Sequence, residues 1–197
     1  MTAFDADGAE FLGRELASHR QVFEATASAI EPSFLQALEL LESSVREGGK
    51  LLLFGNGGSA ADAQHIAAEL VVRYKRDRTA IAALALTTDT STLTACSNDL
   101  GYDLVFSRQI QALAIPGDVA IGISTSGRSA NVLAGLSQAK RQGALCMGMT
   151  GRDAGRMTEM CDVVISVPSN VTARVQEMHI LVGHMLCNAL EIRLGLV

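Results

Sequence analysis

The first part of the chain has apolar residues at helical spacing, set among charged and polar ones. The spacing of Phe11, Leu12 and Leu16 predicts a helix over residues 9–29. Pro32 suits the first turn of a second helix, which two glycines just before residue 50 bring to an end. We therefore expect two helices ahead of the rest of the fold.

Beyond residue 49, short apolar runs alternate with helical segments. The runs lack polar alternation, which is typical of strands buried on both faces of a parallel sheet. We therefore expect one domain with an α/β fold, a doubly wound, flavodoxin-like parallel sheet of five strands. Residues 1–48 would form its N-terminal helical pair and residues 49–197 its core. The predicted strands are 50–54, 80–86, 118–123, 144–149 and 162–167, and the helices are 59–73, 90–114 (broken at 98–101), 129–142 and 172–194.

The charge balance argues against a nucleic-acid partner. The chain has 16 Lys and Arg residues, 21 Asp and Glu residues and a formal net charge of −5, whereas proteins that hold nucleic-acid backbones usually carry positive charge. The sequence has no signal-peptide pattern and no apolar run long enough to span a membrane. Its cysteines are scattered, without metal-ligand spacing. We expect a cytoplasmic protein with no nucleic-acid or membrane partner.

Two loops that follow predicted strands are rich in glycine or hydroxyl residues. They are residues 55–59 (GNGGS) and 124–129 (STSGRS), and each opens a helix. Backbone N–H groups at a helix start, together with hydroxyl side chains, suit a phosphate dianion. Neither loop has the lysine of a P-loop or the glycine pattern of a dinucleotide site. Two serine-capped turns without a ligand are the alternative that these residues leave open.

Titratable side chains lie on the helices expected at 59–73 and 172–194. His65 and Glu69 are four residues apart and therefore share a helix face. Imidazole nitrogen and carboxylate oxygen are good zinc ligands. The last helix offers further polar side chains, those of Gln176, Glu177, His179 and His184. Histidines on helices are more often core residues, so spacing alone leaves both a metal site and a purely structural role open.

The residues of these loops and helices resemble the sedoheptulose 7-phosphate isomerase (phosphoheptose isomerase) family of SIS, or sugar-isomerase, domains. The resemblance covers nearly the whole chain. It is strongest in residues 55–70 (GNGGSAADAQHIAAEL) and recurs in 87–91, 98–99, 117–127 and 172–184. The SIS fold alone would be weak evidence of activity, because one fold hosts many functions. The combination of Glu69 with His184 makes the match sharper.

The resemblance implies a ketose–aldose isomerase that converts sedoheptulose 7-phosphate to D-glycero-D-manno-heptose 7-phosphate through an enediol or enediolate. This is the first step of ADP-heptose synthesis for lipopolysaccharide or a related glycan. It also implies one Zn²⁺ per subunit, bound by His65, Glu69, Gln176 and His184. The positions that match substrate-binding residues are Asn56, Gly57, Gly58, Glu69, Asn98, Asp99 and Gln176 for the sugar, with Ser124, Thr125, Ser126 and Ser129 for the phosphate.

Glu69 and His184 match the family's acid/base pair. One carboxylate near the reacting carbons can move a proton between C1 and C2, and a histidine of intermediate pKa can move one between O1 and O2. If Glu69 also ligates zinc its basicity falls, so the two roles compete. The chain departs from the family at Arg128, where many members have Asn, and at Ala173, where some have Asp.

Two other functions stay open as alternatives. One is a non-catalytic SIS regulator that binds the replication initiator, although such a relative departs at the acid/base positions. The other is a SIS isomerase of another sugar phosphate.

The family is tetrameric, so we expect a homotetramer with active sites at subunit interfaces. Gln176 and His184 are eight residues apart, or about 12 Å along a straight helix. Either both side chains lean inward or helices from neighbouring subunits complete each site, and we expect sites that mix residues of more than one chain.

Overall fold

The computed structural model describes residues 3–197, with side chains from residue 8 onward. The strands are β1 (Leu51–Gly55), β2 (Ala83–Ala85), β3 (Val119–Ser124), β4 (Leu145–Thr150) and β5 (Val163–Ser166). The helices are α1 (Ala3–Ala29), α2 (Glu31–Arg46), α3 (Gly58–Val71), α4 (Thr90–Asp99), α5 (Val105–Leu113), α6 (Ala130–Arg141), α7 (Met157–Met160) and α8 (Thr172–Arg193), with a 3-10 turn, η1 (Tyr102–Leu104), before α5.

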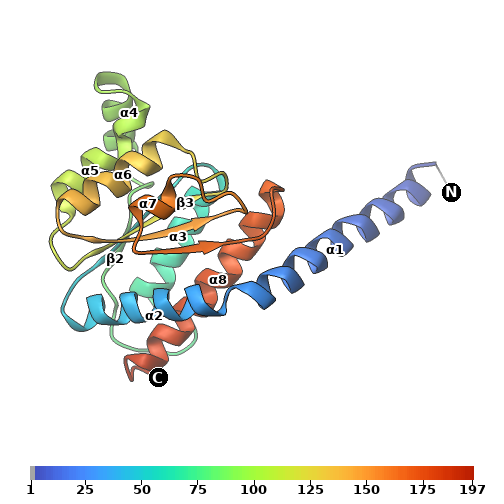
Figure 1. Cartoon of the computed structure of the whole chain (residues 1–197), viewed down its shortest axis with the longest axis horizontal. Helices are drawn as coiled ribbons and strands as arrows, with labels where there is room; N and C mark the ends of the chain where they lie inside the picture. The colour runs from blue at the N-terminus through green and yellow to red at the C-terminus, as the bar shows by residue number, and fades with distance from the viewer. Residues whose placement is uncertain (1–2) are drawn as a thin grey trace.

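The strands form one parallel sheet in the order β2-β1-β3-β4-β5 (Figure 1). This is the flavodoxin-like order, and the expected fold class is confirmed. The order reverses between β1 and β3, where Gly55 is in register with Ile123. In such sheets ligands bind beyond the carboxyl ends of the strands at the reversal. The loops that follow β1 and β3 lie at that place.

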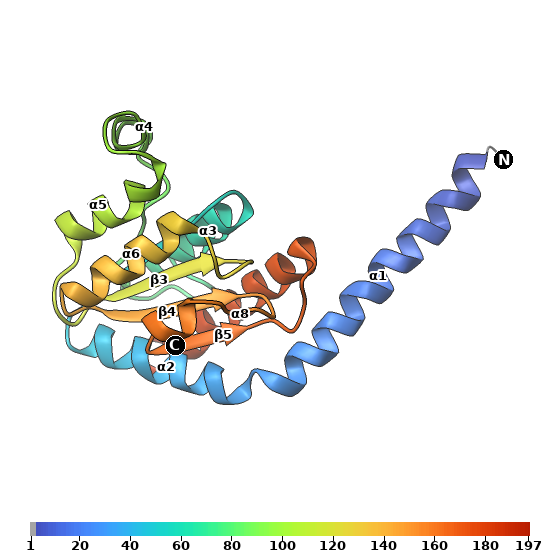
Figure 2. The same ribbon diagram turned by 45° about the horizontal axis from the view of Figure 1, so that its top comes forward.

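Helices cover both faces of the sheet (Figures 1 and 2). Alternate residues of β1 face opposite cores, because side chains alternate along a strand. Leu51 and Leu53 pack with α2, α3 and α8. Leu52 and Phe54 pack with α5, α6 and α7. This double burial explains why the strands read as unbroken apolar runs.

Two helices stand out from this body. Figures 1 and 2 show α1 extending well beyond the sheet and α4 projecting beside α5. The projecting part of α1 carries exposed apolar side chains, of which Phe11 is 57% exposed and Leu16 59%. Among the helices of residues 3–197, none is both long enough and apolar enough to cross a membrane.

The structure differs from the sequence-based expectation in two segments. The expected strand 80–86 is shorter in the structure, where β2 covers residues 83–85 and its neighbours Ala82 and Leu86 still bond to β1. The backbone N–H of Ile81 instead donates to the carbonyl of Leu70 at the end of α3. The short helix α7 was not predicted, since four residues are too few for apolar periodicity to emerge.

Candidate active site

The loop after β1 is fastened to the start of α6 through Asn56. The side-chain amides of Asn56 and Asn131 exchange two hydrogen bonds, each 2.8 Å long. The hydroxyl of Tyr102 donates to Asn56 Oδ1 at 2.9 Å. The Asn56 side chain thus connects the loop after β1 to the start of α6 and to η1. Asn131 and Tyr102 were missed in the sequence analysis, because neither belongs to a motif.

The loop after β3 gathers its hydroxyl groups at the start of α6. Ser124 Oγ and Ser129 Oγ are 2.9 Å apart. The backbone N–H of Arg128 donates to Ser126 Oγ at 3.3 Å. Ser129 is the N-cap residue of α6 but makes no side-chain capping bond. Its hydroxyl is therefore available, with the first N–H groups of the helix, to an anion.

A cavity of about 270 Å³ opens beside these hydroxyls. Arg128 forms an ion pair across it with Asp153, from the loop after β4. Both side chains are largely exposed. The predicted phosphate residues thus adjoin a hollow large enough for a phosphate group. Its lining comes from three loops and the start of α8: Thr125, Ser126, Arg128, Asp153, Asn170 and Thr172.

A second cluster of polar side chains lies where α3 and α8 pack together. His65 Nε2 is 3.0 Å from His184 Nε2 and 3.2 Å from Glu69 Oε1. One ligand atom from each of the three residues lies within 4.8 Å of the others. The ring of Tyr74 lies 5.4 Å from that of His184, centroid to centroid. All three residues come from one chain, so Glu69 and His184 need no second subunit to meet.

The cluster fits a tetrahedral metal ion. Zinc–nitrogen bonds of 2.0–2.1 Å set neighbouring ligand atoms about 3.3 Å apart, close to the 3.0 and 3.2 Å separations here. Hydrogen bonding alone explains the arrangement less well. A neutral imidazole carries at most one hydrogen on Nε2, and His65 Nε2 faces two acceptor-type atoms. His65, Glu69 and His184 therefore suit zinc.

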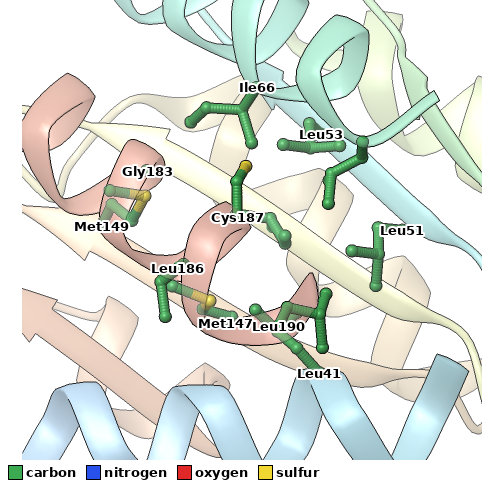
Figure 3. Close-up of a pocket in the computed structure, with 12 residues that line it drawn as sticks. Leu41, Leu51, Leu53, Ile66, Met147, Met149, Gly183, Leu186, Cys187 and Leu190 are labelled. Carbon is green, nitrogen blue, oxygen red and sulfur yellow. The ribbon is translucent and has the colours of Figure 1, made fainter. Parts of the chain in front are cut away.

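The close approach of α3 and α8 depends on Gly183. A Cβ atom at this position would lie 2.6 Å from Ile66 Cδ1, nearer than any side chain tolerates without a shift. Ile66 follows His65 in sequence, and Gly183 precedes His184. The contact between Ile66 and Gly183 therefore helps to set the separation of the two histidine rings. Figure 3 shows both residues at one side of a small cavity under α8. That cavity measures about 20 Å³ and has only apolar lining, so it holds no sugar.

Gln176 lies away from this cluster in the single chain. Its amide nitrogen would be 2.4 Å from a Cβ on Gly58, so the amide rests on the first turn of α3. Gly58 precedes His65 by seven residues, or about 10 Å along the helix. Gln176 therefore lies beside residues 55–59, the loop after β1. We call this segment the sugar loop, because the family resemblance assigns sugar-binding residues to it. The sequence-based assignment of Gln176 as a metal ligand stays a prediction.

The remaining predicted sugar residues, Asn98 and Asp99, end the projecting helix α4. Asn98 Nδ2 donates to Asp99 Oδ1 at 2.8 Å, in an exposed position. Within the part of the chain that the structure describes, neither side chain bonds to the loops after β1 or β3. Within one chain, the loops after β1 and β3 thus lie together, whereas the histidine cluster lies about 10–16 Å along α3 from Gly58. Asn98 and Asp99 stay exposed at the end of α4.

Two further titratable residues have unusual surroundings. Burial raises the pKa of Asp62 to about 6, and the neighbouring His65 partly opposes this shift. Asp62 Oδ2 is buried without a hydrogen-bond partner among the described residues. His179 is fully buried with Nε2 3.1 Å from the carbonyl of Thr150, and burial lowers its pKa to about 4. His179 is therefore a core residue.

The chain is similar to known proteins in both sequence and structure. The SIS domain family profile matches residues 16–151. The chain is 56% identical over 183 residues to the phosphoheptose isomerase of Paramagnetospirillum magneticum, covering 93% of this chain and 95% of the relative. The solved phosphoheptose isomerase of Neisseria gonorrhoeae has 42% identity and a TM-score of 0.88, over 93% of this chain and 98% of that one. That of Francisella tularensis has 33% identity and a TM-score of 0.88, over 98% and 100%.

These matches decide between a shared fold and a shared family. A flavodoxin-like sheet hosts many unrelated activities, so similar architecture alone would settle little. Here the identity reaches 56% over 93% of the chain. The stretch that resembled the family most, residues 55–70, is also where the structure places the sugar loop, His65 and Glu69. The chain belongs to the SIS domain family and, within it, to the phosphoheptose isomerases.

Proposed function

We propose that Glu69 and His184 carry out the reaction of this phosphoheptose isomerase, the conversion of sedoheptulose 7-phosphate to D-glycero-D-manno-heptose 7-phosphate. The observation that carries the proposal is the convergence of His65, Glu69 and His184 in a chain 56% identical to a phosphoheptose isomerase. An aldose–ketose isomerisation needs one group that moves a proton between carbons and another that moves a proton between oxygens.

The two residues divide this work by their chemistry. Glu69 takes a proton from C1 of the ketose and returns it to C2, on one face of the enediol. His184 transfers the proton between O1 and O2, because an imidazole both donates and accepts near neutral pH. The two side chains reach the same place from α3 and α8, so a substrate lying against His65 meets both.

Zinc is the metal that this donor set fits. His65 and His184 supply nitrogen ligands and Glu69 an oxygen, and the two histidine nitrogens are 3.0 Å apart. When bound, zinc stabilises negative charge on the substrate oxygens as a Lewis acid. A zinc ion bound tightly by one oxygen of Glu69 would lower the basicity of the whole carboxylate. We therefore propose that Glu69 is a weak ligand whose other oxygen acts as the base.

The 7-phosphate is bound by the loop after β3. Ser124, Ser126 and Ser129 offer hydroxyls, and the start of α6 offers N–H groups that favour a dianion. Asn56, Gly57 and Gly58 hold the sugar from the adjoining loop. The product then enters ADP-heptose synthesis for lipopolysaccharide or a related glycan.

The assembly we propose is a homotetramer whose active sites combine chains. The sugar loop and the cluster are far apart within one chain, since His65 lies about 10 Å and Glu69 about 16 Å along α3 from Gly58. The projecting helices α1 and α4 (Figure 2) further support a partner chain, because α1 exposes Phe11, Leu12 and Leu16 and the exposed side chains of Asn98 and Asp99 end α4.

A turnover assay tests the reaction directly. The purified protein is given sedoheptulose 7-phosphate, and the aldose phosphate is measured by chromatography and NMR. We expect turnover that a chelator abolishes and zinc restores. Unphosphorylated sedoheptulose and fructose 6-phosphate serve as substrate controls. Absence of turnover with the heptulose phosphate, in protein that is folded and loaded with zinc, would contradict the proposal.

Hybrid tetramers test the shared site. Glu69→Gln is mixed with a Ser126→Ala/Ser129→Ala variant after dissociation and reassembly. Activity is measured at substrate well below the KM of the serine variant, where that parent turns over slowly. If the cluster and the phosphate loop of one site come from different chains, some hybrid sites regain both, and activity rises above that of either parent. Mixing Glu69→Gln with His184→Ala is the matched control, and should restore nothing, because these two residues lie together in one chain. Verified hybrids that are no more active than their parents in either mixture would overturn the shared site.

A further inference from the structure

A buried ion pair lies directly behind the histidine cluster. Arg78 Nε donates to Glu191 Oε1 at 2.8 Å, and each side chain is 1% exposed. Arg78 follows α3 by seven residues, and Glu191 lies near the end of α8, seven residues after His184. A spacing of seven on a helix returns to the same face, so Glu191 lies on the side of α8 that carries His184.

The pair holds the backbone on both sides of the cluster. Arg78 Nη2 donates at 2.8 Å to the carbonyl of Glu69, in the last turn of α3. Glu191 Oε1 also accepts from the backbone N–H of Tyr74 at 3.1 Å. The ring of Tyr74 in turn lies against His184. The ion pair of Arg78 and Glu191 thus connects Glu69, a proposed metal ligand, to Tyr74. The ring of Tyr74 packs on His184, another proposed ligand.

Packing alone does not account for this pair. Burying two charges is costly, and apolar side chains of similar volume often stabilise a protein as well or better. The pair is also incompletely satisfied, since Glu191 Oε2 is buried without a partner in the described residues. Groups beside a metal site that orient its ligands often change metal affinity by 10- to 100-fold.

We propose that Arg78 and Glu191 are positioning residues that fix Glu69 and the Tyr74 ring around His65 and His184. The inference rests on the proposed function of this cluster, and it concerns contacts that act through other residues. Loss of the hydrogen bonds from Arg78 to the Glu69 carbonyl and from the Tyr74 N–H to Glu191 should therefore reduce zinc affinity and kcat. It should change the stability of the protein much less.

Three variants separate positioning from stability. Arg78→Lys keeps the charge but loses the planar fork that reaches Glu191 and the Glu69 carbonyl together. Glu191→Gln keeps the shape and removes the charge. The double variant Arg78→Met/Glu191→Leu replaces the pair by apolar side chains. The control is Asp118→Asn, which breaks the buried pair of Lys50 Nζ and Asp118 Oδ2, 2.6 Å apart, at the amino ends of the strands.

The readouts are zinc affinity by chelator competition, kcat and KM for sedoheptulose 7-phosphate, and the thermal midpoint. In Arg78→Lys, Glu191→Gln and the double variant, we expect zinc affinity to weaken about 10- to 100-fold and kcat to fall with KM nearly unchanged. The thermal midpoint of the double variant should stay near that of the wild type. Asp118→Asn should lower the midpoint and leave zinc affinity and kcat unchanged.

Wild-type zinc affinity and kcat in all folded variants would overturn the proposal, as would equal losses in Asp118→Asn. If the double variant does not fold, Arg78→Lys and Glu191→Gln decide. The wild type is measured first, so that lack of turnover is recognised as failure of the proposed function. Zinc affinity then still tests the positioning. A wild type with neither turnover nor zinc binding would overturn the inference too.

Discussion

The loops at the strand ends and the α3–α8 contact satisfy their polar groups in opposite ways. In the loops, side chains bond mainly to one another, as Asn56 does to Asn131 and Ser124 to Ser129. At the helix contact, His184 Nε2 and Glu69 Oε1 both lie against His65 Nε2, which carries at most one hydrogen to share between them. The first arrangement builds a surface that receives a ligand. The second is suited to a metal ion and to moving protons.

This difference separates binding from chemistry in the molecule. Substitutions in the loops should weaken substrate binding, because each hydroxyl contributes one hydrogen bond among several. Substitutions at the helix contact should remove the reaction itself. Each prediction below tests one side of that division.

The largest effect is expected at Glu69. Glu69→Gln retains the shape of the side chain but removes the base, so kcat should fall by roughly 10²- to 10⁴-fold. The thermal midpoint should change little. Glu177→Gln is the control, because Glu177 is also a partly buried helix carboxylate but pairs with His19 and Arg174. Activity of Glu69→Gln within a few fold of the wild type would rule out the base role.

A second effect concerns His179 of α8. Its Nε2 lies 3.1 Å from the carbonyl of Thr150, at the end of β4, and burial lowers its pKa from 6.5 to about 4. The unfolded chain then binds more protons between these values, so stability is full above pH 6.5 and is lost as the pH falls towards 4. The loss attributable to this group is about 3 kcal/mol.

Denaturant unfolding of the wild type and His179→Gln, compared from pH 7 to pH 4, measures it. Glutamine can still donate to the Thr150 carbonyl but does not titrate in this range. The difference between the two unfolding free energies should therefore shrink on acidification. Parallel curves would show that His179 is not held neutral.

A third effect should appear in binding. Ser126→Ala and Ser129→Ala should each weaken binding of the 7-phosphate by about 1–3 kcal/mol, the range for hydrogen bonds to a charged group. KM should rise while kcat stays within a few fold. Ser137→Ala, on the same helix α6 but beyond its first turn, is the control. A fall in kcat at constant KM would show that these serines act in the reaction itself and not in substrate binding.

The sequence predicted the fold almost completely, for a physical reason. Strands buried on both faces leave unbroken apolar runs, and helices with one covered face leave periodic ones. The length of the edge strand β2 was overestimated at its start, because the backbone N–H of Ile81 donates to the end of α3 instead of to β1.

The candidate site was predictable only in part. The helical spacing of His65 and Glu69 indicates that they share one helix face, and the family resemblance adds His184 to the candidate site. No local pattern indicates that Gly183 lets α8 approach Ile66. The partners Arg78 and Glu191 are separated by 113 residues, and such contacts become visible only when the chain is folded.

The smallest effect is expected at Arg128, where many family members have Asn. Its guanidinium pairs with Asp153, and both side chains are largely exposed, so water and salt screen the charge that it presents to the phosphate. Arg128→Asn should raise KM less than about fivefold without changing kcat. The rise should be present at roughly 0.01 M ionic strength and absent at roughly 1 M, where salt screens the charge. Asp153→Asn should do the opposite, because it frees Arg128 for the phosphate and lowers KM at low salt. Michaelis curves for the two variants at both ionic strengths check this. If Asp153→Asn raised KM as Arg128→Asn does, the pair would be holding the loop in shape, and the charge of Arg128 would play no direct part in binding.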